Sequence, residues 1–131
     1  VQASGADGAG LTSNGAAYVV FGKAGGASNA NWTNIDLNTL GGSAYMRING
    51  SGNNQGTNMS AAGAGDMNGD GLADIAVSNY AAASGPGSTR SGAGLVWVVN
   101  GGASLPDVNL ASGVAGSGFR IDGAAAGDAL G

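Results

Sequence analysis

Short runs of apolar and aromatic residues recur along the chain, separated by longer stretches rich in Gly, Ser, Asn and Asp. The runs at residues 16–22, 44–48, 75–77 and 94–99 carry Val, Ile, Tyr, Phe and Trp, which favour strands. Gly or Asn stands at or just after the end of each run, where the chain has to turn. The pattern predicts an all-β chain of short strands joined by turns.

The second half of the chain repeats the first. Two segments recur 73 residues later, and a third, which precedes a strand, recurs 77 residues later. The matched pairs are 34–37 with 107–110, 46–50 with 119–123, and 15–16 with 92–93. A repeat of some 70 residues with four short strands has the size of one β-propeller blade with long loops.

Composition supports this prediction and limits the chemistry. Gly accounts for 28 of the 131 residues, yet the recurring apolar runs and a net charge of only −4 favour a folded chain. All eight acidic residues are Asp, and Lys23 is the only lysine, so helix formers are scarce. Without Cys, additional stabilisation has to come from metal or from neighbouring domains. Four basic residues cannot form a nucleic-acid patch, and no apolar stretch approaches the ~20 residues of a membrane span.

The most specific pattern is an oxygen-rich loop. Asp66, Asn68, Asp70 and Asp74 occupy positions one, three, five and nine, and the backbone carbonyl of Leu72 falls at position seven. Carboxylates crowded this closely repel one another, so folding the loop without a cation would be costly. All of these donors are oxygen, and the chain has no His or Cys. The pattern therefore predicts that Ca²⁺ is bound by these five residues.

The same residues allow two alternatives to a calcium loop. The loop starts like an EF-hand, but position twelve is Val77 and not Glu, and the flanks at 61–65 and 75–77 do not resemble helices. We therefore expect a strand, the loop and a second strand. A metal-free turn is the other alternative, because Asn, Asp and Gly favour turns for their own reasons.

Three segments together resemble the FG-GAP repeat: GAAYVVFG at 15–22, the loop with its flanks at 62–77, and FRIDG at 119–123. That family builds the β-propeller head of integrin alpha subunits and of many bacterial secreted proteins, with calcium between the first two strands of a blade. The resemblance implies blades of four short antiparallel strands, about two blades in this chain. The chain departs from the family where Val99 and Asn100 replace the second Phe-Gly pair.

The repeat also predicts where blades begin and end. Val1 matches Val77, just after a loop, and Gly131 falls just before the next strand. Residues 1–56 are then a partial blade that lacks its first strand, and residues 57–131 are a complete calcium-loop blade with the start of the next repeat. Fewer than two complete blades leave edges and faces open, so we expect a segment of a longer chain or copies that assemble into a ring or fibre.

The remaining candidates are aromatic residues, two arginines and two glycosylation patterns. Trp32 and Tyr80 lie in predicted loops, where an exposed ring is the better binding candidate. Arg47 and Arg120 occupy equivalent repeat positions, which favours a shared structural role. Aromatic residues inside predicted strands are expected to be blade core and not a ligand platform, and these are Tyr18, Phe21, Tyr45, Trp97 and Phe119. The glycosylation patterns at 31–33 and 58–60 arise often by chance in an Asn-rich chain.

Catalysis is hard to support, because the absence of His, Cys and Glu removes most general bases and nucleophile partners. We expect a non-catalytic, calcium-binding propeller segment for adhesion or surface scaffolding. Extracellular modules bind calcium at ~10⁻⁴ to 10⁻³ M, which fits a secreted or cell-surface location. Its partners would be other repeats of the same or neighbouring chains and a protein or glycan ligand. The alternatives are a subunit of a self-assembling extracellular filament and an accessory region of a secreted hydrolase.

Overall fold

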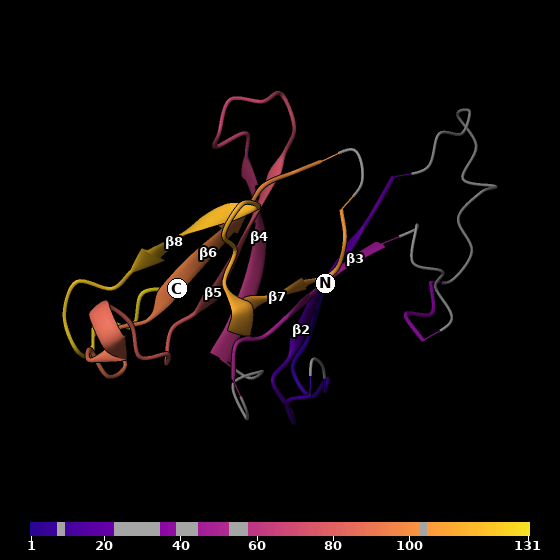
Figure 1. Ribbon diagram of the computed structural model, residues 1–131. Helices are drawn as coiled ribbons and strands as arrows, with labels where there is room; N and C mark the ends of the chain where they lie inside the picture. Colours follow the sequence, from indigo (N-terminus) through magenta and orange to yellow (C-terminus); the bar gives the residue numbers. More distant parts are fainter. Residues whose placement is uncertain (8–9, 23–34, 39–44, 53–57, 103–104) are drawn as a thin grey trace.

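The computed structural model describes residues 1–7, 10–22, 35–38, 45–52, 58–102 and 105–131 (Figure 1). These residues form eight strands and two short 3-10 helices, η3 (Pro86–Ser88) and η4 (Leu110–Ser112). No α-helix occurs among them, so the predicted all-β fold is confirmed. Within the same residues there is no helix long and apolar enough to cross a membrane. The lysine at position 23, Trp32 and the glycosylation pattern at 31–33 lie outside the described residues.

The strands form two four-stranded sheets that lie next to each other (Figure 1). In spatial order the first sheet contains β1 (Gln2–Ala3), β2 (Ala16–Val20), β3 (Tyr45–Asn49) and β7 (Val108–Asn109). The second sheet contains β4 (Met59–Gly65), β5 (Asp74–Asn79), β6 (Leu95–Val99) and β8 (Gly118–Asp122). All neighbouring strands are antiparallel except β3 and β7. Two mainly antiparallel four-stranded sheets are the arrangement expected of partial β-propeller blades.

The two sheets repeat the same register. Ala16 pairs with Asn49 in the first sheet, and Leu95 pairs with Asp122 in the second. Strand β8 therefore matches β3 at the predicted offset of 73, whereas β6 matches β2 at an offset of 79. Strand β1 matches β5 in the same way, since Val1 accepts a hydrogen bond from Tyr18 N–H where β5 pairs with β6. The second sheet thus reproduces three strands of the first.

The predicted match of Gly15 to Gly92 is wrong, because Gly15 corresponds to Gly94. The carbonyl of Gly15 accepts a hydrogen bond from the N–H of Gly50 at 3.0 Å, and the carbonyl of Gly94 accepts one from Gly123 at 3.0 Å. Residues 92–94 read Gly-Ala-Gly, and a match by residue type alone selects Gly92. The hydrogen bonds between the strands identify Gly94 instead.

One face of each sheet packs against the other sheet. Because residues paired across antiparallel strands share a face, each sheet has two distinct sets of side chains. The first sheet buries Met46 and Ile48 in this core, and the second sheet buries Val77, Trp97 and Val99. The prediction that Trp97 is core is confirmed, with 3% of the residue exposed.

Three other aromatic residues that are predicted to be core are more exposed than Trp97. Tyr18 and Tyr45 are half-buried on the far face of the first sheet, where their rings lie 5.6 Å apart. Phe119 is 41% exposed on β8, so its assignment to the core is wrong. Phe119 faces away from the first sheet, because its partner on β6 is Val98 and not the inward-facing Trp97.

Close backbone contact between strand ends recurs in both repeats. A Cβ atom on Gly50 would collide with the carbonyl of Asn14, and one on Gly123 would collide with the carbonyl of Ala93. Different side chains then bind the two matching carbonyls. Asn14 Nδ2 donates to the carbonyl of Gly50 at 3.0 Å, and Arg90 Nη1 donates to the carbonyl of Gly123 at 2.9 Å. Both repeats thus require glycine at this position, but a different residue donates a hydrogen bond to its carbonyl in each repeat.

We expect Gly123→Ala to lower the free energy of unfolding by about 2 to 3 kcal/mol, because the added methyl group forces two backbones apart. Gly63→Ala in β4 is the matched control, since its Cβ meets nothing within 4 Å. That control should stay within about 0.5 kcal/mol of the parent or gain slightly. Urea unfolding followed by circular dichroism measures both. Equal stability of the two variants would contradict the close contact.

Candidate metal site

The oxygen-rich loop connects β4 to β5, which pair as an antiparallel hairpin. Gly65 pairs with Asp74 across the base of the loop, and the register shifts between Gly63 and Gly65. Strands on both sides confirm the predicted strand, loop and strand arrangement, which differs from an EF-hand. Gly69 and Gly71 have φ values of +79° and +85°, which residues with a Cβ rarely adopt. Glycine at these two positions allows the sharp winding of the loop.

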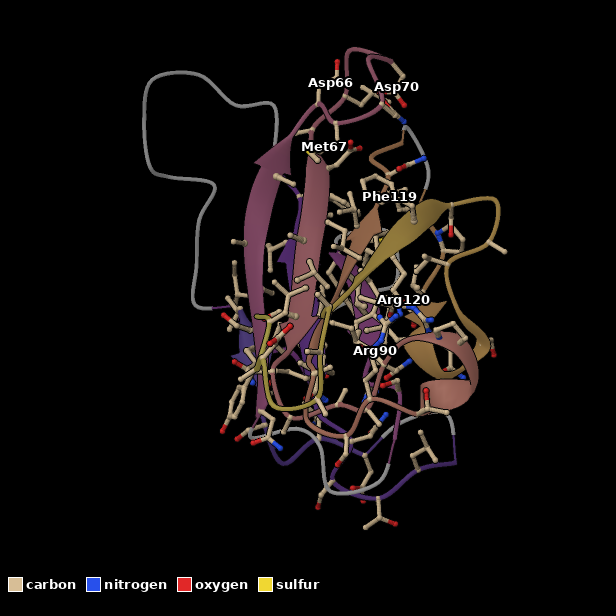
Figure 2. All side chains as sticks on the ribbon, turned by 90° about the vertical axis from the view of Figure 1, so that its left-hand side faces the viewer. Asp66, Met67, Asp70, Arg90, Phe119 and Arg120 are labelled. Carbon is tan, nitrogen blue, oxygen red and sulfur yellow. The ribbon has the colours of Figure 1, made fainter. Side chains whose placement is uncertain are left out.

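The Asp66 carboxylate organises the loop backbone. Its Oδ1 accepts hydrogen bonds from the N–H groups of Gly69 at 2.7 Å and Asp70 at 3.0 Å. Its Oδ2 accepts one from Gly71 at 2.8 Å. Three successive amides therefore point at one carboxylate, and the backbone wraps around it. Figure 2 shows Asp66 and Asp70 at the tip of this loop.

Asn68 and Asp70 join the same network. The N–H of Asp70 is shared by Oδ1 of Asp66 and Oδ1 of Asn68, each at 3.0 Å. Asn68 Nδ2 donates to Asp70 Oδ2 at 2.9 Å, and the N–H of Leu72 donates to Asp70 Oδ1 at 2.8 Å. The structure therefore brings the first three predicted ligands together in one exposed turn.

Asp74 has a different position. The residue is only 1% exposed. Its Oδ1 accepts a hydrogen bond from the N–H of Gly101, and its Oδ2 accepts one from Met67, both at 2.7 Å. The bond from Gly101, followed by those from Met67 and Asn68, lowers the pKa of Asp74, although burial acts in the opposite direction. Asp74 is thus a buried anion that connects the base of the loop to the end of β6.

The oxygen donors of the loop fit a hard cation. In the structure, however, they are not arranged as a complete coordination shell. Asp66, Asn68 and Asp70 supply carboxylate and amide oxygens, which Ca²⁺ prefers. Both oxygens of Asp74 already accept backbone hydrogen bonds. Among the residues that the structure describes, no three acidic side chains lie close enough to hold a metal ion. The calcium site stays a prediction.

Sequence reasoning missed the part that Gly101 plays in this site. Gly101 follows β6 in a Gly-Gly pair, 27 residues after Asp74. A Cβ atom at Gly101 would collide with the carbonyl of Ala73, so glycine is needed for this close approach. The pair of glycines after β6 was the available signal, but a turn alone accounts for it.

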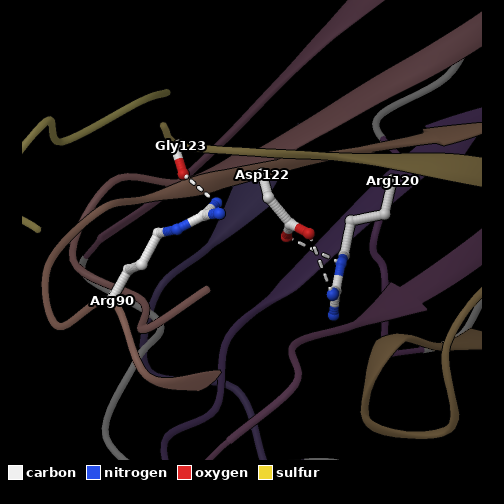
Figure 3. Close-up of polar contacts among 4 residues, drawn as sticks. All are labelled: Arg90, Arg120, Asp122 and Gly123. Carbon is white, nitrogen blue, oxygen red and sulfur yellow. Dashed lines mark hydrogen bonds and ion pairs between the residues drawn. The ribbon is translucent and has the colours of Figure 1, made fainter. Parts of the chain in front are cut away.

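The two equivalent arginines contact their own sheets. Arg120 Nε lies 2.9 Å from Asp122 Oδ1 on the same strand, as Figure 3 shows. Arg47 lies over the ring of Tyr18, 5.7 Å from its centroid, and donates to the carbonyl of Asp7. These contacts agree with a structural role for both arginines.

The remaining candidates occupy the surface or a strand end. Tyr80 is 49% exposed, as expected for a loop residue. The second glycosylation pattern, at 58–60, runs into the start of β4.

Comparison with known proteins gives one match. The model of the FG-GAP repeat family matches residues 59–99. No curated protein and no solved structure matches the chain. The matched segment begins at the first residue of β4 and ends at the last residue of β6, so it contains the whole oxygen-rich loop. This match confirms the predicted resemblance to the FG-GAP repeat over residues 59–99.

Proposed function

We propose that this chain is a calcium-binding, non-catalytic propeller segment of a secreted or cell-surface protein, used for adhesion or surface scaffolding. The observation that carries the proposal is the loop wound around Asp66, with Asn68 and Asp70 in the same turn. FG-GAP repeats are typically extracellular and non-catalytic, which supports the location and the absence of chemistry.

Each of the five residues would supply its own donor group to the ion. Asp66, Asn68 and Asp70 would supply side-chain oxygens, Leu72 a backbone carbonyl, and Asp74 a carboxylate. Bound calcium would supply the positive charge that offsets repulsion among these carboxylates. Because Asp66 already gathers three amides, little of the loop has to be ordered when the ion binds. Asp74 holds the base of the loop in place through Met67 and Gly101.

Adhesion is supported by what the loop exposes. Met67 is 52% exposed and Leu72 is 43% exposed, so two apolar side chains are exposed between the oxygen donors. An ion that fixes the loop backbone would also fix these side chains. A partner surface could then contact a rigid patch, which lowers the entropy cost of binding.

Calcium should stabilise the chain. At a free concentration 10 to 100 times the dissociation constant, binding to the folded state alone adds about 1.4 to 2.7 kcal/mol. We expect the melting temperature to rise by roughly 5 to 10 °C when 10 mM CaCl₂ replaces a chelator. Differential scanning calorimetry measures the shift, with MgCl₂ as the ion control. An identical melt in calcium and in chelator would contradict the proposal.

Two variants locate the effect. Asp70→Asn should lose most of the increase that calcium gives, because it removes a charged ligand from the loop. Asp128→Asn is the matched control: it removes one negative charge and keeps an acceptor for the N–H of Ala125. The control should keep the full calcium response. If both variants respond alike, the ion binds elsewhere or acts through the net charge.

The variants Asp74→Ala and Asp70→Ala should differ in melting temperature when calcium is removed. Asp74→Ala removes a buried carboxylate and leaves the N–H groups of Met67 and Gly101 without their acceptor, so it should lower the melting temperature even in chelator. Asp70→Ala affects an exposed side chain and should leave the melt in chelator within a few degrees of the parent. Thermal unfolding in chelator measures both. Equal losses would show that Asp74 is not the anchor described above.

A further inference from the structure

Matching positions of the two repeats differ sharply in burial. Met46 and Ile48 of β3 are 0% exposed, whereas their equivalents on β8, Phe119 and Ile121, are 41% and 44% exposed. All four side chains are large and apolar. The second sheet therefore carries, on the face away from the first sheet, apolar residues at positions that the first sheet buries completely. Nothing in the described part of the chain covers Phe119 and Ile121 as the second sheet covers Met46 and Ile48.

The surface that covers Met46 and Ile48 is the opposite face of the second sheet. Trp97, Val99 and Val77 belong to that face, and they share one core cluster with Met46 and Ile48. The chain thus contains one complete junction, in which one face of a blade packs on the opposite face of the next blade.

The first sheet carries the equivalent of that covering face. Tyr18 matches Trp97 and Val20 matches Val99, because each stands at the same register position in its sheet. Both residues are half-buried, and Tyr45 lies beside Tyr18 with the ring centroids 5.6 Å apart. We name Tyr18, Val20 and Tyr45 the tyrosine face, and Val96, Phe119 and Ile121 the apolar face.

We propose that the apolar face of one copy of this chain binds the tyrosine face of a second copy, head to tail. The contact would repeat the junction already present between the two sheets, with Phe119 and Ile121 in the places of Met46 and Ile48. Tyr18 takes the place of Trp97 on the other side. This inference depends on the structural repeat and not on calcium, so either proposal can fail without the other.

The geometry of such a contact limits the size of the assembly. A junction between two different faces generates a ring if the rotation closes and an open filament if it does not. Propellers close with typically 4 to 8 blades, and each chain supplies two sheets. A ring of roughly two to four copies follows. Arg47 lies over Tyr18 and would stand beside the junction, as Arg120 stands beside Trp97.

Sedimentation velocity of the 131-residue chain over a hundredfold range of concentration tests the proposal. The wild type should associate as concentration rises and reach a limit at two to four copies. Phe119→Glu should prevent association, because it places a charge on the apolar face. Ile35→Glu is the matched control, since Ile35 is apolar, is 43% exposed like Phe119, and belongs to neither face. It should associate like the wild type. Circular dichroism confirms that each variant is folded.

A mixing experiment identifies the two faces. Tyr45→Glu should also prevent association, because Tyr45 belongs to the tyrosine face. Phe119→Glu keeps an intact tyrosine face, and Tyr45→Glu keeps an intact apolar face. An equimolar mixture of the two variants should therefore form a 1:1 dimer that neither forms alone. A wild type that stays monomeric at every concentration would overturn the proposal. So would a mixture that stays monomeric, or a Tyr45→Glu variant that associates normally, since the latter indicates contact between two apolar faces.

Discussion

Each sheet of this chain has apolar side chains on both faces, and the two sheets can bury only one face each against the other. This constraint accounts for most of the architecture. The shared core takes Met46 and Ile48 from the first sheet and Trp97 and Val99 from the second. Burial of apolar area is the main favourable term in folding, so this single junction supplies most of the cohesion between the sheets. Strand β7 reinforces it, because it leaves the second repeat and pairs with β3 of the first sheet.

The loop at the β4–β5 hairpin follows a second, electrostatic constraint. A carboxylate can be buried when hydrogen-bond donors replace the water that it loses. Asp74 meets this condition through two backbone amides. Asp66 accepts hydrogen bonds from three backbone amides but stays exposed at the tip of the loop. The first anchors the loop to the end of β6, and the second sets its curvature. Residues with the same side chain, eight positions apart, thus have different functions and different exposure.

Much of the fold could be predicted from the sequence, because strand formation and turn chemistry are local. The apolar runs gave β2, β3, β5 and β6 to within a few residues, and the loop between β4 and β5 followed from its spacing. Quantities set by neighbouring strands could not be predicted. Residue type cannot distinguish Gly92 from Gly94, since only the ladder bonds decide the register. The exposure of Phe119 depends on which face the other sheet covers, and Gly101, which binds Asp74, follows a strand 27 residues further along the chain.

The position of the loop also shows where a cation would matter most to stability. Strand β4 is an edge strand, and Met59 is the only one of its seven residues that is fully buried. The remaining residues of β4 are Ser, Ala and Gly, which bury little apolar area and lose much backbone entropy on folding. Strand β4 is therefore held mainly by its ladder to β5 and by the hydrogen bonds at the two ends of the hairpin. Binding energy placed in the loop would therefore act on a strand that has little hydrophobic burial of its own.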